Sequence, residues 1–431
     1  MKKLTVILLC LCLIRGFTMY GDDAPPSAHP QVGAKFESSE ILIELVSKKQ
    51  NYNWNDKVYR DQDIYSPKSV NIDPAGKKFY VNSLEGGTTV VYDFNSLEKL
   101  SVIQHKFTVA DSALWAPRSG YFKFKHNYPN PDAFTGKPVE STFSHKGRFL
   151  WVPYYRRSFD LNAQEPSALA VIDTRKDSIV KLFETGPLPK MIATSQDEEY
   201  VAVTHWGDNT VGIINVASMN PDEWRYVGCY TVDRQLKLDL PLDTKVDRDV
   251  NSGYCLRGTV FTPNGRYLLV GCMGGGGGIA VIDVRNDKYL GRVLGAMPNL
   301  RHLVLDRGYL YASINNAGYV QKIALKSFLD CLGNFNNGVT TLKGWENCKV
   351  NPGARTIVLS PDGKWAFVAC NSSSCISILR TDTMTYVGCI KADSYPVGLD
   401  ISKDGEYLIS TSQGRNGVGG NCVDIFRITY K

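Results

Sequence analysis

Residues 354–390, ARTIVLSPDGKWAFVACNSSSCISILRTDTMTYVGCI, contain the pattern that decides the fold. The apolar segment TIVLS is followed by the turn PDGK, then by WAFVAC, the small-residue loop NSSS, CISIL and MTYVGCI. Alternating apolar positions rich in β-branched and aromatic residues, cut by Gly, Pro, Asp and Ser, are typical of short strands joined by turns. The stretch therefore predicts four antiparallel strands.

The same order of elements returns six more times along the chain. The turn glycine, which provides the positive φ of a tight hairpin, is present in every copy except one, where Glu198 replaces it. The six copies are residues 69–103, 141–183, 191–216, 259–294, 302–325 and 398–428. Four-stranded units of roughly 40 residues are typical of propeller blades. The sequence predicts an all-β, seven-bladed β-propeller with four antiparallel strands per blade.

The last copy is incomplete, because the chain ends with its third strand, VDIFRITYK. Residues 38–49, SSEILIELVSKK, form an orphan strand near the other end of the chain. If this strand completes the last blade, the ring is closed and no open edge is left there. We therefore expect a single propeller domain over residues 38–431, preceded by a flexible segment, residues 22–37.

Several segments resemble a known repeat family. SPDGKWAFVACNSSSCISI, EYVAVTHWGDNTVGIINV and RYLLVGCMGGGGGIAVIDV are similar to the YVTN-type, WD40-like β-propeller repeats of YncE-like exported bacterial proteins, and the similarity covers residues 67–430. The resemblance implies the seven-bladed fold. It does not select a function, because related propellers include binding proteins, lactonases and redox subunits.

The first residues, MKKLTVILLCLCLIRG, join a basic start to an apolar run that is too short to span a bilayer. We expect residues 1–21 to be a signal peptide and the protein to be periplasmic or extracellular, without a transmembrane anchor. A lipoprotein acylated on Cys10 or Cys12 is the less favoured alternative. Removing residues 1–21 lowers the formal net charge from +6 to +3, which does not suggest nucleic acid as a partner.

Nine cysteines remain after residue 21, all from Cys229 onward. Disulfides persist in exported proteins, so Cys370–Cys375 and Cys331–Cys348 are candidate disulfide bonds, and the odd number leaves at least one thiol over. No C-x-x-C-H motif is present, and the six histidines have no metal-ligand spacing, so neither a cofactor nor a metal is predicted.

Four insertions are expected on one face of the ring. Residues 104–138, 231–255 and 329–352 are assigned to connections between the fourth strand of one unit and the first strand of the next, and residues 154–168 join a second strand to a third. These connections open on the face opposite the PDGK turns. We call the two faces the insertion-rich face and the turn-bearing face. Long loops on a rigid scaffold are where binding residues concentrate.

Basic residues recur just before the apolar core of the first strand of each unit. The aligned residues are Lys68, Glu140, Lys190, Arg257, Arg301, Arg355 and Val397. On a ring, the five cations are expected to surround the mouth of the channel and attract an anion. In the alternative interpretation, each cation pairs with an acid of a neighbouring blade. His302 follows Arg301, and since strand alternation sends them to opposite sides, we expect Arg301 to face the site.

Two loops add candidate ligand-binding residues on the insertion-rich face. The loop THWGDNTV carries His205, Trp206 and Asp208, and the rim segment YYRR carries Arg156 and Arg157. Each of these residues has a plain structural alternative, such as packing against the next blade.

Three functions follow from these residues. The first is an exported binding or scaffold protein for an anionic small molecule or an acidic polysaccharide, with another exported protein as an alternative partner. The second is a lactonase-like hydrolase, or a lyase or hydrolase that acts on acidic sugars. His205 would be its base, Asp208 or Glu140 its acid, and Arg301 or Arg355 would neutralise the substrate charge. The third, a redox accessory protein, is least favoured because the haem motif is missing. The catalytic residues, if any, are not identified by the sequence.

Overall fold

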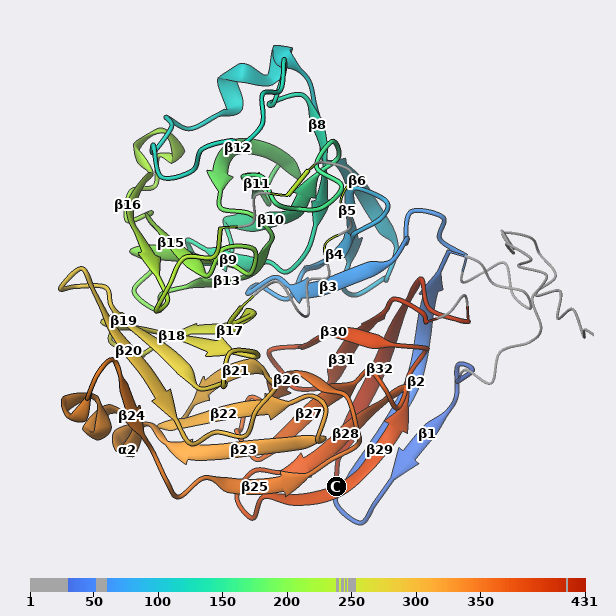
Figure 1. Ribbon diagram of the computed structural model, residues 1–431. Helices are drawn as coiled ribbons and strands as arrows, with labels where there is room; N and C mark the ends of the chain where they lie inside the picture. Colours follow the sequence, from blue (N-terminus) through green and yellow to red (C-terminus); the bar gives the residue numbers. More distant parts are fainter. Residues whose placement is uncertain are drawn as a thin grey trace, which may run out of the picture.

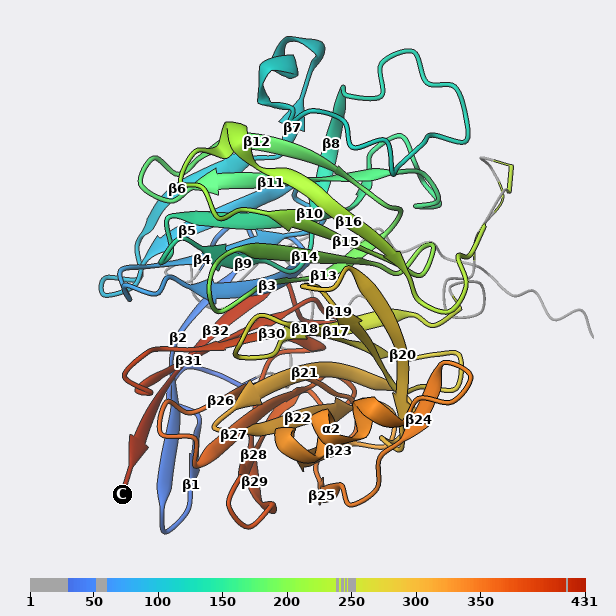
Figure 2. The same ribbon diagram turned by 90° about the vertical axis from the view of Figure 1, so that its left-hand side faces the viewer.

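The computed structural model describes residues 30–51, 60–237, 240–241, 244, 246, 253–415 and 418–431. Within these residues the chain forms seven antiparallel sheets arranged as the blades of a β-propeller, which confirms the predicted fold class. Figure 1 shows the innermost strands of the blades gathered round the middle of the ring, and Figure 2 shows the ring from its side. The expected signal peptide lies outside the described residues.

Each blade runs outward from its first strand, and its middle strands are apolar on both faces because a neighbouring blade packs against each side. In β27, WAFVAC, all six residues are buried. The strands of the first three blades are β3 (Pro67–Ile72), β4 (Lys78–Ser83), β5 (Thr88–Asp93) and β6 (Lys99–Gln104); β9 (Thr142–Ser144), β10 (Phe149–Arg157), β11 (Ser167–Asp173) and β12 (Ser178–Thr185); and β13 (Pro189–Thr194), β14 (Tyr200–His205), β15 (Thr210–Asn215) and β16 (Arg225–Thr231).

The other four blades follow the same plan. Their strands are β17 (Leu256–Phe261), β18 (Tyr267–Cys272), β19 (Ile279–Asp283) and β20 (Lys288–Leu294); β21 (Leu300–Asp306), β22 (Tyr309–Ile314), β23 (Tyr319–Ala324) and β25 (Glu346–Lys349); β26 (Ala354–Leu359), β27 (Trp365–Cys370), β28 (Cys375–Arg380) and β29 (Thr385–Lys391); and β30 (Pro396–Ile401), β31 (Tyr407–Ser412), β32 (Cys422–Tyr430) and β2 (Ile41–Gln50).

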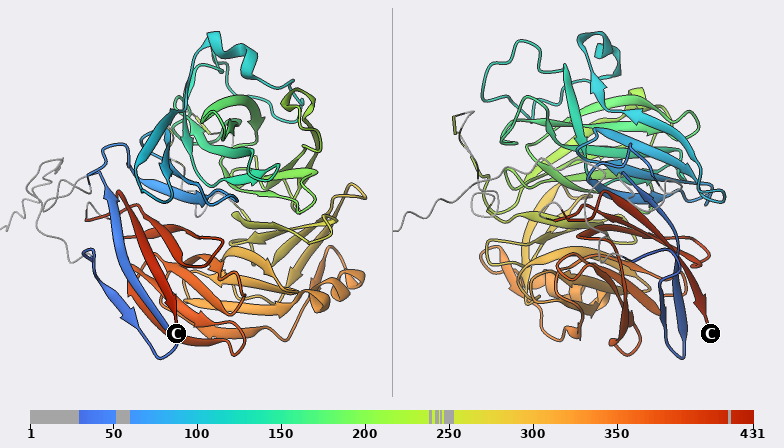
Figure 3. Two further views of the ribbon diagram at one scale, coloured as in Figure 1. Left: turned by 180° about the vertical axis from the view of Figure 1, so that it is seen from behind. Right: turned by 90° about the vertical axis from the view of Figure 1, so that its right-hand side faces the viewer.

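The last blade is closed by the N-terminal strand, as predicted. Strand β2 pairs antiparallel with β32, from Ile41 opposite Tyr430 to Gln50 opposite Cys422. Figure 3 shows this strand in blue beside the red C-terminal strands. Buried Lys48 of β2 lies 2.8 Å from a carboxylate oxygen of Asp393 and 3.1 Å from one of Asp424, so an ion-pair network ties the two chain ends together.

The N-terminal boundary of the domain differs from the expectation. Residues 35–37, assigned to a flexible segment, form β1 (Lys35–Glu37), which pairs with β2 as a fifth strand of the last blade. The aromatic ring of Phe36 lies against Gly388 of β29, where a Cβ atom would come within 2.3 Å of it. The ordered domain therefore begins before residue 38.

The insertion at residues 329–352 is placed differently from the prediction. The fourth strand of its blade is β25, so the insertion joins the third strand to the fourth. It consists of α2 (Leu325–Asp330), η4 (Cys331–Asn334) and β24 (Val339–Thr341), and β24 pairs in parallel with β20 of the preceding blade. These elements lie on the outer rim (Figure 1). The fourth strand has only four residues, ENCK, which carry no strand pattern that the sequence analysis could use.

The other insertions lie in the connections that the sequence predicted. Residues 104–138 follow β6, and residues 231–255 follow β16 and are described only in part. Of the predicted loop 154–168, residues 158–166 join β10 to β11, and its ends belong to those two strands. Besides β1, α2, η4 and β24, the described residues form four more short elements outside the four-strand plan, which are β7 (Lys106–Phe107), η2 (Val109–Leu114), β8 (Phe134–Pro138) and η3 (Pro221–Glu223). Among the described residues, no helix is long and apolar enough to cross a membrane.

Candidate functional site

The five predicted cations occupy the same structural position in five blades. Each is the second residue of an innermost strand, and the pairing of each strand with its neighbour shifts register at that point. A bulge of this kind interrupts the alternation of a strand and turns a side chain in a new direction. We call these residues the cation cluster: Lys68 of β3, Lys190 of β13, Arg257 of β17, Arg301 of β21 and Arg355 of β26.

The cation cluster is brought together in space, and four of its five members are buried while Arg301 is partly buried. Lys68, Arg257 and Arg355 have 4–5% of their surface exposed, and Lys190 has 9%. Burial, together with the charges of Arg355, Arg257 and Arg301, lowers the pKa of the Lys68 ammonium well below its ordinary value. Burial and the same arginines lower the pKa of Lys190 in the same way. The five side chains therefore repel one another across the channel.

Glu140, the acid at the aligned position of the second unit, is the internal counter-ion of this cluster. Its carboxylate lies 3.8 Å from the Nζ atom of Lys68 and also acts electrostatically on Arg257 and Arg355. Among the described residues, no carboxylate forms an ion pair with Lys190, Arg257 or Arg355. Within the described part of the chain, the carboxylate of Glu140 is therefore outnumbered by the three cations on which it acts.

Aromatic rings cover the cation cluster on the insertion-rich side. The Nζ atom of Lys190 lies 3.9 Å from the ring centre of Tyr155 and 5.0 Å from that of Trp206. The guanidinium carbon of Arg257 lies 4.4 Å from the centre of Trp206. The Nε atom of Arg257 is buried without a hydrogen-bond partner within the described part of the chain. Cation–π contacts stabilise the cations here but supply no negative charge.

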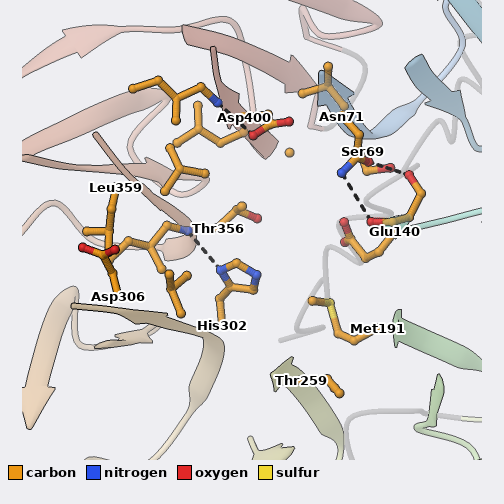
Figure 4. Close-up of a pocket in the computed structure, with 18 of the residues that line it drawn as sticks. Ser69, Asn71, Glu140, Met191, Thr259, His302, Asp306, Thr356, Leu359 and Asp400 are labelled. Carbon is orange, nitrogen blue, oxygen red and sulfur yellow. Dashed lines mark hydrogen bonds between the residues drawn. The ribbon is translucent and has the colours of Figure 1, made fainter. Parts of the chain in front are cut away.

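A cavity of about 440 Å³ lies in the channel next to the cluster. Figure 4 shows His302 and Glu140 turned toward its middle from opposite sides. The Nδ1 atom of His302 accepts the N–H of Ile357 at 3.3 Å, so in the neutral ring the proton is on Nε2. Burial lowers the pKa of His302, which favours this neutral form. His302, rather than Arg301, lines the cavity, whereas Arg301 belongs to the cation cluster above it.

His205 and Asp208 are placed apart from the cation cluster. The ring of His205 is buried edge-on to Phe122, with 5.2 Å between the ring centres, and its Nδ1 lies 2.8 Å from the hydroxyl of Thr210. That hydroxyl donates to Asp208. Burial lowers the pKa of His205 to about 3 and raises that of Asp208 to about 6. Of the three residues predicted in this loop, only Trp206 contacts the cluster.

The rim arginines are engaged within their own region. Arg157 is fully buried, donates to the carbonyl oxygens of Pro131 and Ser167, and lies over the ring of Phe134. It therefore fixes the insertion at residues 104–138 against the second blade, and its side chain is not available to a ligand. Arg156 donates to two carbonyl oxygens of its own loop.

The predicted disulfide bonds are not found. None of the nine described cysteines is bonded to another. Cys370 and Cys375 face each other across β27 and β28 but remain thiols, and Cys331 and Cys348 lie in separate hydrophobic clusters. Among the described residues, no group of His, Cys, Asp and Glu side chains is arranged to hold a metal ion.

Some residues near the cluster were missed by sequence reasoning. An Nη atom of Arg301 lies 2.8 Å from the sulfur of Met273, and Tyr395 forms a hydrogen bond that raises the pKa of Arg355 against the lowering effect of burial. Both residues are in connections on the insertion-rich face. Their positions in loops on the insertion-rich face could have indicated that they lie near the cluster. A methionine and a tyrosine do not by themselves indicate an anion-binding site.

No protein-family model matches the chain, and no curated protein sequence matches it. The fold is similar to that of solved structures. A chain of Kuenenia stuttgartiensis hydrazine synthase aligns with a TM-score of 0.56 at 15% identity, over 87% of this chain and 99% of that one. The β-propeller domain of Cps50 (Swd1) from Myceliophteria thermophila aligns with a TM-score of 0.55 at 11% identity, over 85% and 97%. At these identities the similarity establishes the fold alone, and membership of the YVTN-type family remains a prediction.

Proposed function

We propose that this protein is a binding protein whose ligand is anionic and is held by the cation cluster. The observation that supports this proposal is the gathering of five cations from five blades, four of them buried, around the channel, where Glu140 acts on three of them. Like charges in a site of low dielectric repel strongly. An anion with its own hydrogen-bond acceptors compensates that repulsion, and arginine provides the geometry to bind carboxylate, sulfate or phosphate.

Lys48 shows what a structural cation looks like in the same molecule. It is as buried as Lys68, but it lies against two carboxylates, Asp393 and Asp424. Although burial opposes it, the charges of Asp424 and Asp393 raise the pKa of Lys48. In the cation cluster the pKa values of Lys68 and Lys190 are lowered instead. The closure of the ring thus neutralises its buried cation internally, while the cluster leaves positive charge for a ligand.

The alternative of an enzyme has no comparable support. The proposed base, His205, is buried beneath Phe122, has a lowered pKa and does not reach the cation cluster. Glu140 lies among the cations, 3.8 Å from the Nζ atom of Lys68, and no histidine forms a hydrogen bond with it in the described part of the chain. A binding function accounts for the observed groups without requiring a proton-transfer pair.

Isothermal titration calorimetry with sulfate and phosphate, at low and high concentrations of sodium chloride, tests the proposal. We expect saturable binding that weakens with salt. Arg257→Met, which removes a cluster charge but keeps much of the side-chain volume, should weaken binding at least tenfold. Arg156→Met is the matched control, because Arg156 contacts only its own loop among the hydrogen bonds described above. Equal affinities for the two variants, or no binding of any anion to the parent protein, would contradict the proposal.

A further inference from the structure

The channel cavity begins one or two residues beyond the cation cluster, and none of the five cations lines the cavity itself. In each of the five blades, the residue one or two positions after the cation lines the cavity. These lining residues are Ser69, Met191, Thr259, His302 and Thr356. Because a strand advances about 3.3 Å per residue, the cavity begins directly next to the layer of cations. A ligand that touches the cluster can therefore extend into the cavity.

The other end of the cavity reaches the turn-bearing face. Asp306, Ser360 and Pro361 line it there, at the ends of β21 and β26 where the hairpin turns begin, and Pro361 is exposed. On the insertion-rich side, by contrast, Tyr155, Trp206 and Met273 lie against the cations. The described structure thus gives the cluster its open approach from the turn-bearing face, opposite to the face that the insertions suggested.

The chemistry of the wall changes along the cavity. Next to the cations it carries the carboxylate of Glu140 together with neutral hydrogen-bonding groups, which are Ser141, Thr356 and the Nε2–H of His302. Farther along it is aliphatic, with Val304 and Leu399. This order favours a ligand with a charged end, then hydroxyl groups, then a less polar surface.

Acidic residues stand at the outer end of the cavity. Asp306 and Asp400 both line it there, and Asp400 accepts the N–H of Ile72 at 2.7 Å. Burial raises the pKa of Asp400 to about 6, so it carries charge at neutral pH. A second acidic group on the ligand would be repelled here.

The size of the cavity limits the ligand further. Its volume of about 440 Å³ is within the range of small-molecule sites, which is roughly 300–1,000 Å³. At ~30 Å³ per molecule of liquid water, it holds about 15 water molecules, close to the volume of one sugar with its acidic group.

We propose that the ligand is a compact organic anion with a single acidic end, which enters from the turn-bearing face, sets that end against the cation cluster and fills the cavity with its uncharged body. This inference rests on the proposed function and refines it. It selects the small molecule over the acidic polysaccharide, because regularly spaced charges along a polymer would meet Asp306 and Asp400.

Matched probes that share one acidic group test the inference. Calorimetry compares phosphate with glucose 6-phosphate, sulfate with glucose 6-sulfate, and acetate with glucuronate. We expect at least one sugar-bearing anion to bind tenfold or more tightly than its inorganic or two-carbon partner. Oligogalacturonate should bind no more tightly per site than galacturonate.

A larger side chain that fills part of the cavity (a plug) tests whether the uncharged body of the ligand binds there. Val304→Phe should lower the affinity for the preferred organic anion at least tenfold and change the affinity for phosphate or sulfate by less than threefold. Val304→Ala serves as the control for substitution at this position. Retained binding of the inorganic anion shows that the plugged protein is folded, and Leu359→Phe provides a second plug from the adjacent inner strand.

The outcomes separate the two proposals. Binding of inorganic anions without any gain for their organic partners, or organic anions that are unaffected by both plugs, would overturn this inference and leave the proposed function standing. Failure of every probe to bind the parent protein would overturn both.

Discussion

Replacing Glu140 by glutamine should tighten anion binding, because Glu140 occupies the place of the ligand's charge. Its carboxylate lies 3.8 Å from the Nζ atom of Lys68 and acts on Arg257 and Arg355 as well. A ligand that binds the cluster brings a second negative charge close to Glu140 and shares the same cations. Glutamine keeps the size and hydrogen-bonding capacity of the side chain and removes the charge.

The size of the effect follows from Coulomb's law. Two unit charges ~6 Å apart, at an effective dielectric constant of about 20, repel by about 3 kcal/mol. Since about 1.4 kcal/mol corresponds to tenfold in affinity, Glu140→Gln should tighten binding of a singly charged anion by roughly 100-fold. The gain should shrink at high salt. The same substitution removes the internal counter-ion, so the ligand-free variant should be less stable than the parent protein at low salt.

Calorimetric titration and thermal unfolding, each with and without sulfate, measure both effects. Asp400→Asn is the control, because Asp400 lines the same cavity but is held at the far end by the N–H of Ile72. It should change the affinity for sulfate less than fivefold. If Glu140→Gln leaves the affinity unchanged or weakens it, Glu140 does not compete with the ligand, and the electrostatic reasoning is refuted.

Three further predictions concern protonation and the closure of the ring. A bound anion should raise the lowered pKa values of Lys68 and Lys190, so binding should be accompanied by proton uptake. The affinity for the anion should therefore fall as the pH rises through the pKa values of the ligand-free lysines. Calorimetric titration in buffers of different ionisation enthalpy measures the proton uptake, and its absence would contradict the lowered pKa values. Asp208 has a pKa raised to about 6, so the folded protein holds its proton more tightly than the unfolded chain, and stability is lost as the pH rises between about 4 and 6. Relative to Asp208→Asn, the parent protein should lose ~3 kcal/mol of unfolding free energy between pH 4 and pH 7.5 in urea titrations, and parallel curves would refute this. Lys48→Met should cost ~3–5 kcal/mol in the same assay, because it leaves Asp393 and Asp424 buried without their cation, whereas Lys49→Met, on a partly exposed residue, should cost less than about 1 kcal/mol.

The repeat made the fold predictable, because turn chemistry and strand alternation agree in almost every copy. In the copy that lacks the turn glycine, Glu198 takes up the positive φ of 59°, close to the 72° of Gly363. The surrounding hairpin therefore imposes the same turn on a less suitable residue. The strand that closes the ring was predictable because the last copy of the repeat has only three strands, and the strand near the other end of the chain belongs to no copy.

The insertions and the loop residues were harder to predict, because their positions depend on contacts distant in sequence. β25 is too short to show a strand period, so the fourth strand of its blade could not be told apart from an insertion. Arg157 was assigned to the rim, yet the insertion at residues 104–138 folds over it and buries it. His205 and Trp206 are adjacent in sequence, but only Trp206 reaches the cluster.

The position shared by the cluster residues also shows whether the fold itself needs a cation there. In the last blade the same position, the second residue of β30, holds Val397, which is fully buried beside an identical shift of register. An apolar residue therefore satisfies the packing at this point of a blade. Five blades instead carry a lysine or an arginine, whose burial next to like charges is unfavourable to stability. Packing does not require that arrangement. Within the described part of the chain, Glu140 is the carboxylate that acts on Lys68, Arg257 and Arg355, and a bound anion would lower the remaining repulsion between the cations.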